Sequence, residues 1–169
     1  MRKGLTGLVV LLAVLVLATS VSAKAAPTTV VVDNYVVTVG QEFTVPVRIT
    51  DVLNLYGYDV RVPHDRAMLQ GVRVDHGGFL NQPWFVIRNG FWAWNGSGCN
   101  GYCAWYALTS LRPALPTSGN GTLVYVTYRA LQPGVVTLQP WAQLSAPGGV
   151  PIAVTTQGGT VTVLASDKD

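Results

Sequence analysis

Hydrophobic and polar residues alternate along most of the chain with a period of two, which is the pattern of β-strands that bury one face. No segment of ten residues shows the spacing of an amphipathic helix. Turn signals rich in glycine, proline and asparagine separate the alternating segments at intervals of about ten residues. Strands are predicted over residues 29–39, 42–52, 55–62, 68–74, 104–111, 122–131, 135–144 and 160–164, with further strands inside the aromatic-rich segment 79–106. About nine short strands so spaced predict an all-β fold, a jelly-roll β-sandwich in one domain.

The first 25 residues differ from the rest and are typical of a secretory signal peptide. Arg2 and Lys3 precede an apolar stretch over residues 8–18, and small residues follow around Ala23 and Ala25. Cleavage there would leave residues 26–169 as the exported domain, secreted or at the cell surface. An uncleaved leader is the alternative, since residues 4–23 carry no charge and could span a bilayer. Any membrane attachment is expected only through such a leader.

Composition and charge exclude several other classes of protein. Hydrophobic residues make up 49% of the chain and charged residues 11%, which argues against a disordered chain or a coiled coil. The formal charge of +3 belongs to the leader, because eight basic and eight acidic residues remain after residue 25. A neutral exported domain is not expected to bind nucleic acid.

Two cysteines flank a short turn signal in the middle of the chain. Cys99 and Cys103 enclose Asn100-Gly101-Tyr102, and Asn-Gly is a strong signal for a tight hairpin. In an exported protein this spacing predicts a local disulfide across the turn. A metal site would need further ligands, and His64 and His76 are distant in sequence, so we expect neither a metal nor a cofactor.

No arrangement of residues in the sequence favours catalysis. After the leader the chain has one glutamate, Glu42, and its aspartates are scattered, so a carboxyl pair for acid–base chemistry is not evident. Neither histidine has a nucleophile beside it in sequence. We therefore expect no catalytic residues and interpret the chain as a binding protein.

Several short motifs follow one another along the chain: Val39-Gly40, Val45-Pro46-Val47, Asn54-Leu55, Pro63-His64-Asp65 and the segment 118–123. Their order and spacing resemble those of the cohesin family. Arg66 departs from the family, which has proline after this aspartate. The resemblance covers residues 29–164 and implies a nine-stranded jelly roll that binds a protein. In cellulosome scaffolds that partner is a calcium-loaded dockerin, bound on one sheet face.

The resemblance also implies which strands carry the binding face: 55–62, 84–89, 104–111 and 135–144. By alternation, Asp59 and Arg61 point away from the apolar side chains of their strand and should lie on the outer face. Arg88, on a neighbouring strand, is a third candidate for contact with the partner. If these residues bind, Asp59→Ala and Arg61→Ala should weaken binding without lowering thermal stability. The alternative is that they are ordinary solvated surface charges.

The aromatic-rich segment suggests a second function. Trp92 and Trp94 are separated by one residue, so in a strand they project from the same face about 7 Å apart. Exposed together, they could stack against sugar rings, which would make the chain a carbohydrate-binding module for a polysaccharide. Burial in the packing of the sandwich is the alternative, because tryptophan is highly buried on average.

Overall fold

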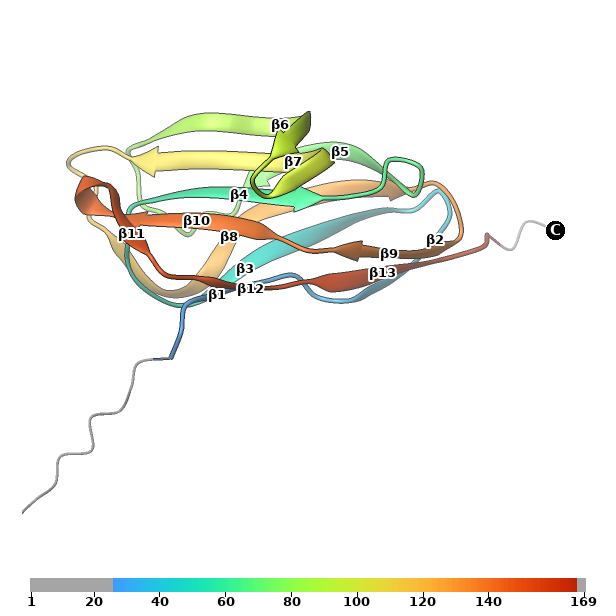
Figure 1. The fold of residues 1–169 in the computed structure, drawn as a ribbon, viewed down its shortest axis with the longest axis horizontal. Coiled ribbons are helices and arrows are strands. Elements are labelled where there is room, and N and C mark those ends of the chain that lie inside the picture. Colours follow the sequence, from blue (N-terminus) through green and yellow to red (C-terminus); the bar gives the residue numbers. More distant parts are fainter. Residues whose placement is uncertain (1–25, 167–169) are drawn as a thin grey trace, which may run out of the picture.

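The computed structural model describes residues 26–166; the leader expected over residues 1–25 lies outside them. Two five-stranded sheets pack face to face, and a three-stranded sheet extends one end of the sandwich (Figure 1). The strand orders are β12-β1-β3-β8-β5, β11-β10-β4-β7-β6 and β2-β13-β9. The strands are β1 Thr29–Val31, β2 Tyr35–Thr38, β3 Glu42–Leu55, β4 Gly57–Pro63, β5 Leu69–His76, β6 Trp84–Gly96, β7 Cys99–Ser110, β8 Thr117–Ala130, β9 Gly134–Leu138, β10 Trp141–Ala146, β11 Val150–Ile152, β12 Thr155–Gln157 and β13 Gly159–Leu164.

The expected all-β sandwich is confirmed, but residues 26–166 form thirteen strands instead of about nine, because two segments expected to be continuous are broken and because β11 and β12 lie where no strand was predicted. The segment 135–144 divides at Pro140 into β9, which pairs with β13, and β10, which pairs with β4. Proline has no amide proton for a sheet ladder, so the chain changes sheets there. The segment 29–39 divides in the same way at Asp33 and Asn34. The Asn34 side chain then accepts hydrogen bonds from the amide and hydroxyl of Thr160.

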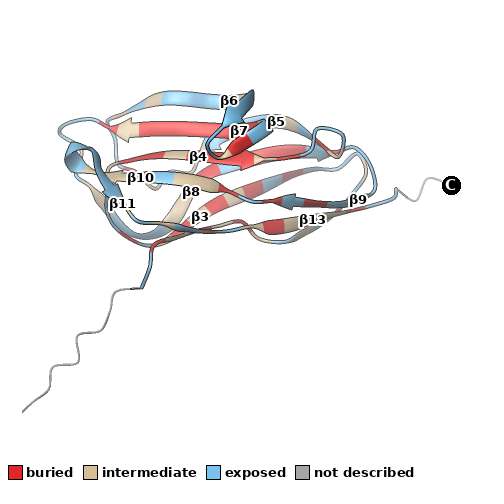
Figure 2. Cartoon of the chain, viewed as in Figure 1, coloured by how far each residue is buried: buried red, intermediate tan, exposed pale blue. Residues whose placement is uncertain are grey.

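The core lies between the two large sheets and follows from the alternating pattern. Inward-facing side chains of β3, β4 and β8 are almost fully buried, while β6 is largely exposed (Figure 2). The Tyr58 hydroxyl crosses the core and donates a 2.7 Å hydrogen bond to the carbonyl oxygen of Leu123 on the opposite sheet. This bond fixes β4 against β8 and therefore fixes the position of the outer face of β4.

Two bulges in β3 explain one of the sequence motifs. Asp51 and Asn54 have positive φ angles of 55° and 56°, and the pairing of β3 with β8 shifts register around them. The amide of Asp51 donates to the Asn120 side chain, and the amide of Asn54 donates to the Ser118 hydroxyl. The polar residues at the start of β8 thus satisfy backbone groups that the bulges remove from the ladder.

Helical structure is minimal in the described part of the chain. The single helical element there is the 3₁₀ turn Pro147–Gly149. No helix within residues 26–166 has the length and apolar character needed to cross a membrane. In the same residues, no three His, Cys, Asp or Glu side chains are grouped to hold a metal ion.

Candidate functional site

The outer faces of the two large sheets differ in chemistry. The face of β12-β1-β3-β8-β5 carries three ion pairs whose side chains are between 41% and 67% exposed. These pairs are Arg48–Asp33, Arg73–Asp75 and Arg129–Glu42. Such a face is well solvated, and exposed ion pairs of this kind contribute little to stability. The other outer face is instead dominated by aromatic side chains.

Cross-strand register assembles this aromatic face from β4, β6, β7 and β10. Arg61 on β4 lies opposite Trp105 of β7 and Trp141 of β10. Asp59 lies opposite Ala107, which in turn pairs with Arg88 on β6. The structure therefore brings together the three charged residues expected from the sequence, and we call this surface the aromatic face.

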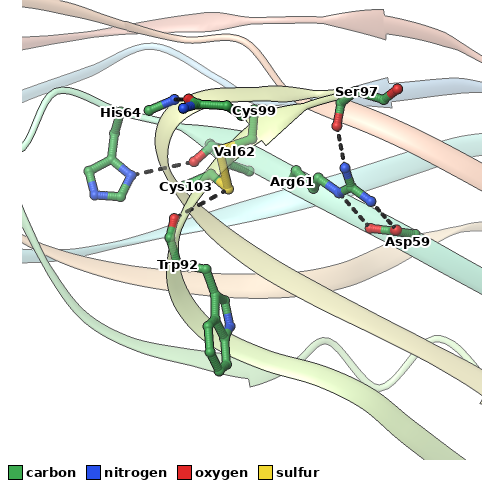
Figure 3. Close-up of a disulfide and its surroundings, with 10 residues drawn as sticks. Asp59, Arg61, Val62, His64, Trp92, Ser97, Cys99 and Cys103 are labelled. Atoms are coloured by element: carbon green, nitrogen blue, oxygen red, sulfur yellow. Dashed lines mark hydrogen bonds and ion pairs between the residues drawn. A yellow bond between two sulfur atoms is a disulfide. The ribbon is translucent and has the colours of Figure 1, made fainter.

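Arg61 is on the aromatic face but is not a solvated charge. The whole residue is only 8% exposed. Its guanidinium lies between two indoles, 3.9 Å from the ring centroid of Trp105 and 4.6 Å from that of Trp141. Two of its nitrogens donate to Asp59 at 3.2 and 2.7 Å, and Nη1 donates to the carbonyl oxygen of Ser97 (Figure 3). The interpretation of Arg61 as an ordinary surface charge is wrong.

The β6–β7 hairpin covers part of the aromatic face. Its strands have 13 and 12 residues, against 7 in β4 and 6 in β10, so its tip extends beyond its neighbours and curls across them (Figure 1). At the tip, Ser97 contacts Arg61, and Gly98 packs so tightly on Trp141 that a Cβ atom there would collide with the indole. The family resemblance implies a binding face across these strands; here part of that face is closed by the hairpin tip.

The cysteines form the expected disulfide, but the expected turn is wrong. Gly96 pairs with Cys99, so the hairpin turns at Ser97-Gly98, and Asn100-Gly101 lies within β7. Both cysteines belong to that strand, with Cα atoms 6.1 Å apart, where four extended residues would span about 13 Å. Gly101, with φ 116°, permits the sharp bend. Ser-Gly and Asn-Gly are both turn signals. Because Asn95 pairs with Asn100 in the ladder, the turn forms at Ser97-Gly98 and not at Asn100-Gly101.

Reducing the disulfide should weaken the fold without unfolding it. Both cysteines are buried, at 2% and 0% exposure, but the loop that they close is very short. Constraint of the unfolded chain by so short a loop contributes about 2 kcal/mol. We therefore expect Cys99→Ser/Cys103→Ser to lower the free energy of unfolding by about that amount in urea titrations. Loss of the far-ultraviolet β-sheet spectrum at room temperature would contradict this expectation.

Four of the five tryptophans lie on the aromatic face, and they differ in exposure. Trp92 and Trp94 are 43% and 46% exposed, whereas Trp105 is 8% exposed. Their rings are already in contact with protein groups. The Arg88 guanidinium lies 5.1 Å from the Trp92 centroid, and Trp94 packs 5.6 Å from Trp105. Trp141 was not among the residues predicted from the sequence. It is three positions before the inward-facing Leu144 in β10, so alternation places its side chain on the outer face.

A pocket of about 290 Å³ opens beside the covered region. Small residues, Gly57 and Ala107, leave room at its base, and Trp105 and Ile87 line it with apolar surface. Its polar lining comes from β4, β6, β7 and β10 and consists of Asp59, Arg88, Thr109, Gln143 and Ser145. The pocket is therefore the hollow part of the aromatic face that the hairpin tip leaves open.

Several solved structures similar to this chain are cohesins. The non-cellulosomal cohesin of Archaeoglobus fulgidus has a TM-score of 0.63 and 18% identity over 84% of this chain and 94% of its own. A type I cohesin from a Clostridium thermocellum cohesin–dockerin complex, Coh-OlpC with Doc435, has a TM-score of 0.65 and 12% identity over 86% and 99%. The third ScaC cohesin of Acetivibrio cellulolyticus, solved with the ScaB dockerin, has a TM-score of 0.64 and 15% identity over 82% and 99%. This chain has the cohesin fold.

The resemblance seen in the sequence is thus confirmed for the fold. No protein-family model matches the chain, and a search of curated proteins also finds no match. At identities of 12–18%, these comparisons show a shared architecture and say nothing about individual residues on the aromatic face. The shared fold therefore describes the arrangement of the strands, and the chemistry of the aromatic face follows from the side chains described above.

A buried histidine lies on the inner side of the sheet that carries the aromatic face. His64 follows β4 and is 8% exposed, with the rings of Phe91, Tyr102 and Tyr128 at 5.6, 5.4 and 4.9 Å. Its amide donates to the carbonyl oxygen of Tyr102 on β7, and its Nδ1 lies 3.4 Å from the carbonyl oxygen of Val62. Burial lowers the pKa of His64 to about 4, so the imidazole is neutral at neutral pH.

Proposed function

We propose that this chain is an exported, non-catalytic module that binds a protein partner through the aromatic face. The observation that carries the proposal is the contrast between the two outer faces. One face has its charges paired and solvated, and the other gathers Trp92, Trp94, Trp105 and Trp141 with two arginines. Tryptophan and arginine are the residue types that most often dominate the affinity of protein interfaces.

A dockerin-type protein is the partner class that the cohesin fold favours. Cohesins similar to this chain, from Clostridium thermocellum and Acetivibrio cellulolyticus, were solved in complex with dockerins. On this proposal Asp59 and Arg88 contact the partner directly. Arg61, buried under the hairpin tip, orients the Asp59 carboxylate through two hydrogen bonds. The leader supports an extracellular location, secreted or at the cell surface, where such modules would meet their partners.

Binding of a polysaccharide is the second candidate. The partial exposure of Trp92 and Trp94 on the same face supports it, since two exposed indoles on one surface are uncommon without a ligand. The contacts of those rings favour the protein partner instead. Each ring already has a protein neighbour, Arg88 over Trp92 and Trp105 beside Trp94, which reduces the ring surface left for stacking on a sugar.

A capture experiment tests the proposal with variants of the two faces. The immobilised protein is incubated with culture supernatant of its source organism, and insoluble cellulose and other polysaccharides serve as parallel baits. We expect capture of a protein with duplicated calcium loops, abolished by a chelator. Thr109→Arg, which places a long side chain into the pocket, should reduce capture at least about tenfold.

The matched control is Tyr125→Arg, on the outer face of the other sheet, where the side chain is 38% exposed. This variant should capture the partner as well as the unmodified protein. Equal loss in both variants would contradict the assignment of the face. Retention on a polysaccharide that is lost in Trp92→Ala/Trp94→Ala would support the second candidate in place of the first.

A further inference from the structure

Arg88 is a cation without a counter-ion on the aromatic face. The side chains of residues 26–166 form four ion pairs, and Arg88 takes part in none of them. Asp59 is the one carboxylate among the residues that line the pocket. Both of its oxygens already accept hydrogen bonds from Arg61, at 3.2 and 2.7 Å. The pocket therefore has an uncompensated positive charge on its wall.

Neighbouring indoles hold the Arg88 guanidinium beside the pocket. It lies 5.1 Å from the ring centroid of Trp92 and 5.3 Å from that of Trp105. Contact with ring faces leaves the in-plane N–H groups of a guanidinium available, and these groups are matched in geometry to a carboxylate. The aromatic contacts also reduce the side-chain freedom that binding would otherwise remove.

The remaining polar groups of the pocket are neutral. Thr109 and Ser145 direct their hydroxyls at backbone carbonyl oxygens, at 3.3 and 3.4 Å. The amide of Gln143 is exposed at the rim, opposite Asp59 in the register of β10 and β4. Beside the pocket, Phe85 and Ile87 are 60% and 57% exposed, and they provide apolar surface next to the charged wall.

We infer that this pocket receives an acidic side chain, Asp or Glu, of the protein partner, with its carboxylate bound by Arg88 and its flanking residues packed on Phe85 and Ile87. The inference rests on the proposed function, because it concerns a protein partner bound at the same face. Charge complementarity carries it: a neutral side chain would leave Arg88 uncompensated in a pocket closed by the partner, and a basic one would be repelled.

Nuclear magnetic resonance titration tests the pocket without knowledge of the partner. The probes are N-acetyl-glutamate amide, its neutral isostere N-acetyl-glutamine amide, sodium acetate and galacturonate. We expect saturable shifts of the Ala107 and Thr109 amides with the glutamate probe, at an affinity at least about tenfold above that of the glutamine probe. Arg88→Gln should remove this preference, and Arg73→Gln, on the other outer face, should retain it.

Each other outcome overturns the inference. Equal affinity for the two amino-acid probes, absence of saturation, or an unchanged preference in Arg88→Gln would show that Arg88 does not select a carboxylate. Acetate as strong as the glutamate probe would indicate a general anion site, and stronger binding of galacturonate would indicate an acidic polysaccharide.

The capture experiment separates failure of this inference from failure of the proposed function. If Thr109→Arg abolishes capture of the partner and Arg88→Gln leaves it unchanged, the protein-binding face stands and the acidic contact is refuted. If the protein captures no partner but the glutamate probe still selects Arg88, the proposed function fails and the pocket's preference for carboxylates stands. Loss of capture in both variants, with an unchanged melting temperature, is the expected result.

Discussion

Replacing Arg61 by Ala is expected to lower the free energy of unfolding by about 3 kcal/mol, which corresponds to a fall of about 10 °C in melting temperature. The substitution removes the guanidinium that stacks on the rings of Trp105 and Trp141, and with it the hydrogen bond to the carbonyl oxygen of Ser97. It also leaves the Asp59 carboxylate, whose side chain is 24% exposed, without its charged partner. Thermal unfolding followed by circular dichroism measures the effect.

The matched control is Arg48→Ala on the other outer face. Arg48 also forms an ion pair, with Asp33, but both side chains are more than 40% exposed. Water screens such a pair, so we expect a loss below about 1 kcal/mol. Similar losses for the two variants would show that burial between the indoles adds nothing. The sequence predicts that Arg61→Ala leaves stability unchanged; the burial of this residue leads to the opposite expectation.

Acidification should destabilise the protein through His64. The pKa of His64 is about 4 in the folded protein, where burial excludes water, and returns to its ordinary value of 6.5 on unfolding. Below pH 6.5 the unfolded chain therefore binds a proton that the folded protein does not. Stability is fully present above that pH and falls as the pH decreases toward 4. Between pH 8 and pH 5 the expected loss is about 2 kcal/mol.

His64→Phe isolates this contribution. Phenylalanine keeps an aromatic ring among Phe91, Tyr102 and Tyr128 but cannot take up a proton. Burial also lowers the pKa of His76, and that contribution is common to both proteins. Urea titrations at pH 8 and pH 5 should therefore show a loss smaller by about 2 kcal/mol in the variant than in the unmodified protein. An equal loss in both proteins would exclude His64 as the source.

The alternating pattern predicted the orientation of the site residues well. Because side chains in a strand alternate between faces, the apolar neighbours Tyr58 and Val60 were enough to place Asp59 and Arg61 outside. The motifs then identified the cohesin fold and therefore which strands lie beside β4. Both inferences depend on local spacing and chain order, which a sequence displays directly.

The burial of Arg61 could not be predicted in this way, because it depends on residues far apart in the chain. Trp141 comes from β10, and Ser97 comes from the tip of the β6–β7 hairpin, 36 residues after Arg61. The hairpin reaches across β4 only because it turns at Ser97-Gly98 and bends at the disulfide. A pattern with period two shows the face of a strand on which a side chain lies, but not what covers that face.

The pairing of the first and last strands sets the order in which the sandwich can form during synthesis. β1 pairs with β12, and β13 is the central strand of its sheet, between β2 and β9. Until residues 155–164 have been made, β2 and β9 have no strand to join them. The two large sheets can pair earlier through β3–β8 and β4–β7, but the three-stranded sheet stays incomplete until these C-terminal strands are available. For a chain exported as proposed above, the sandwich is therefore completed only after its C-terminal strands have been threaded through the membrane.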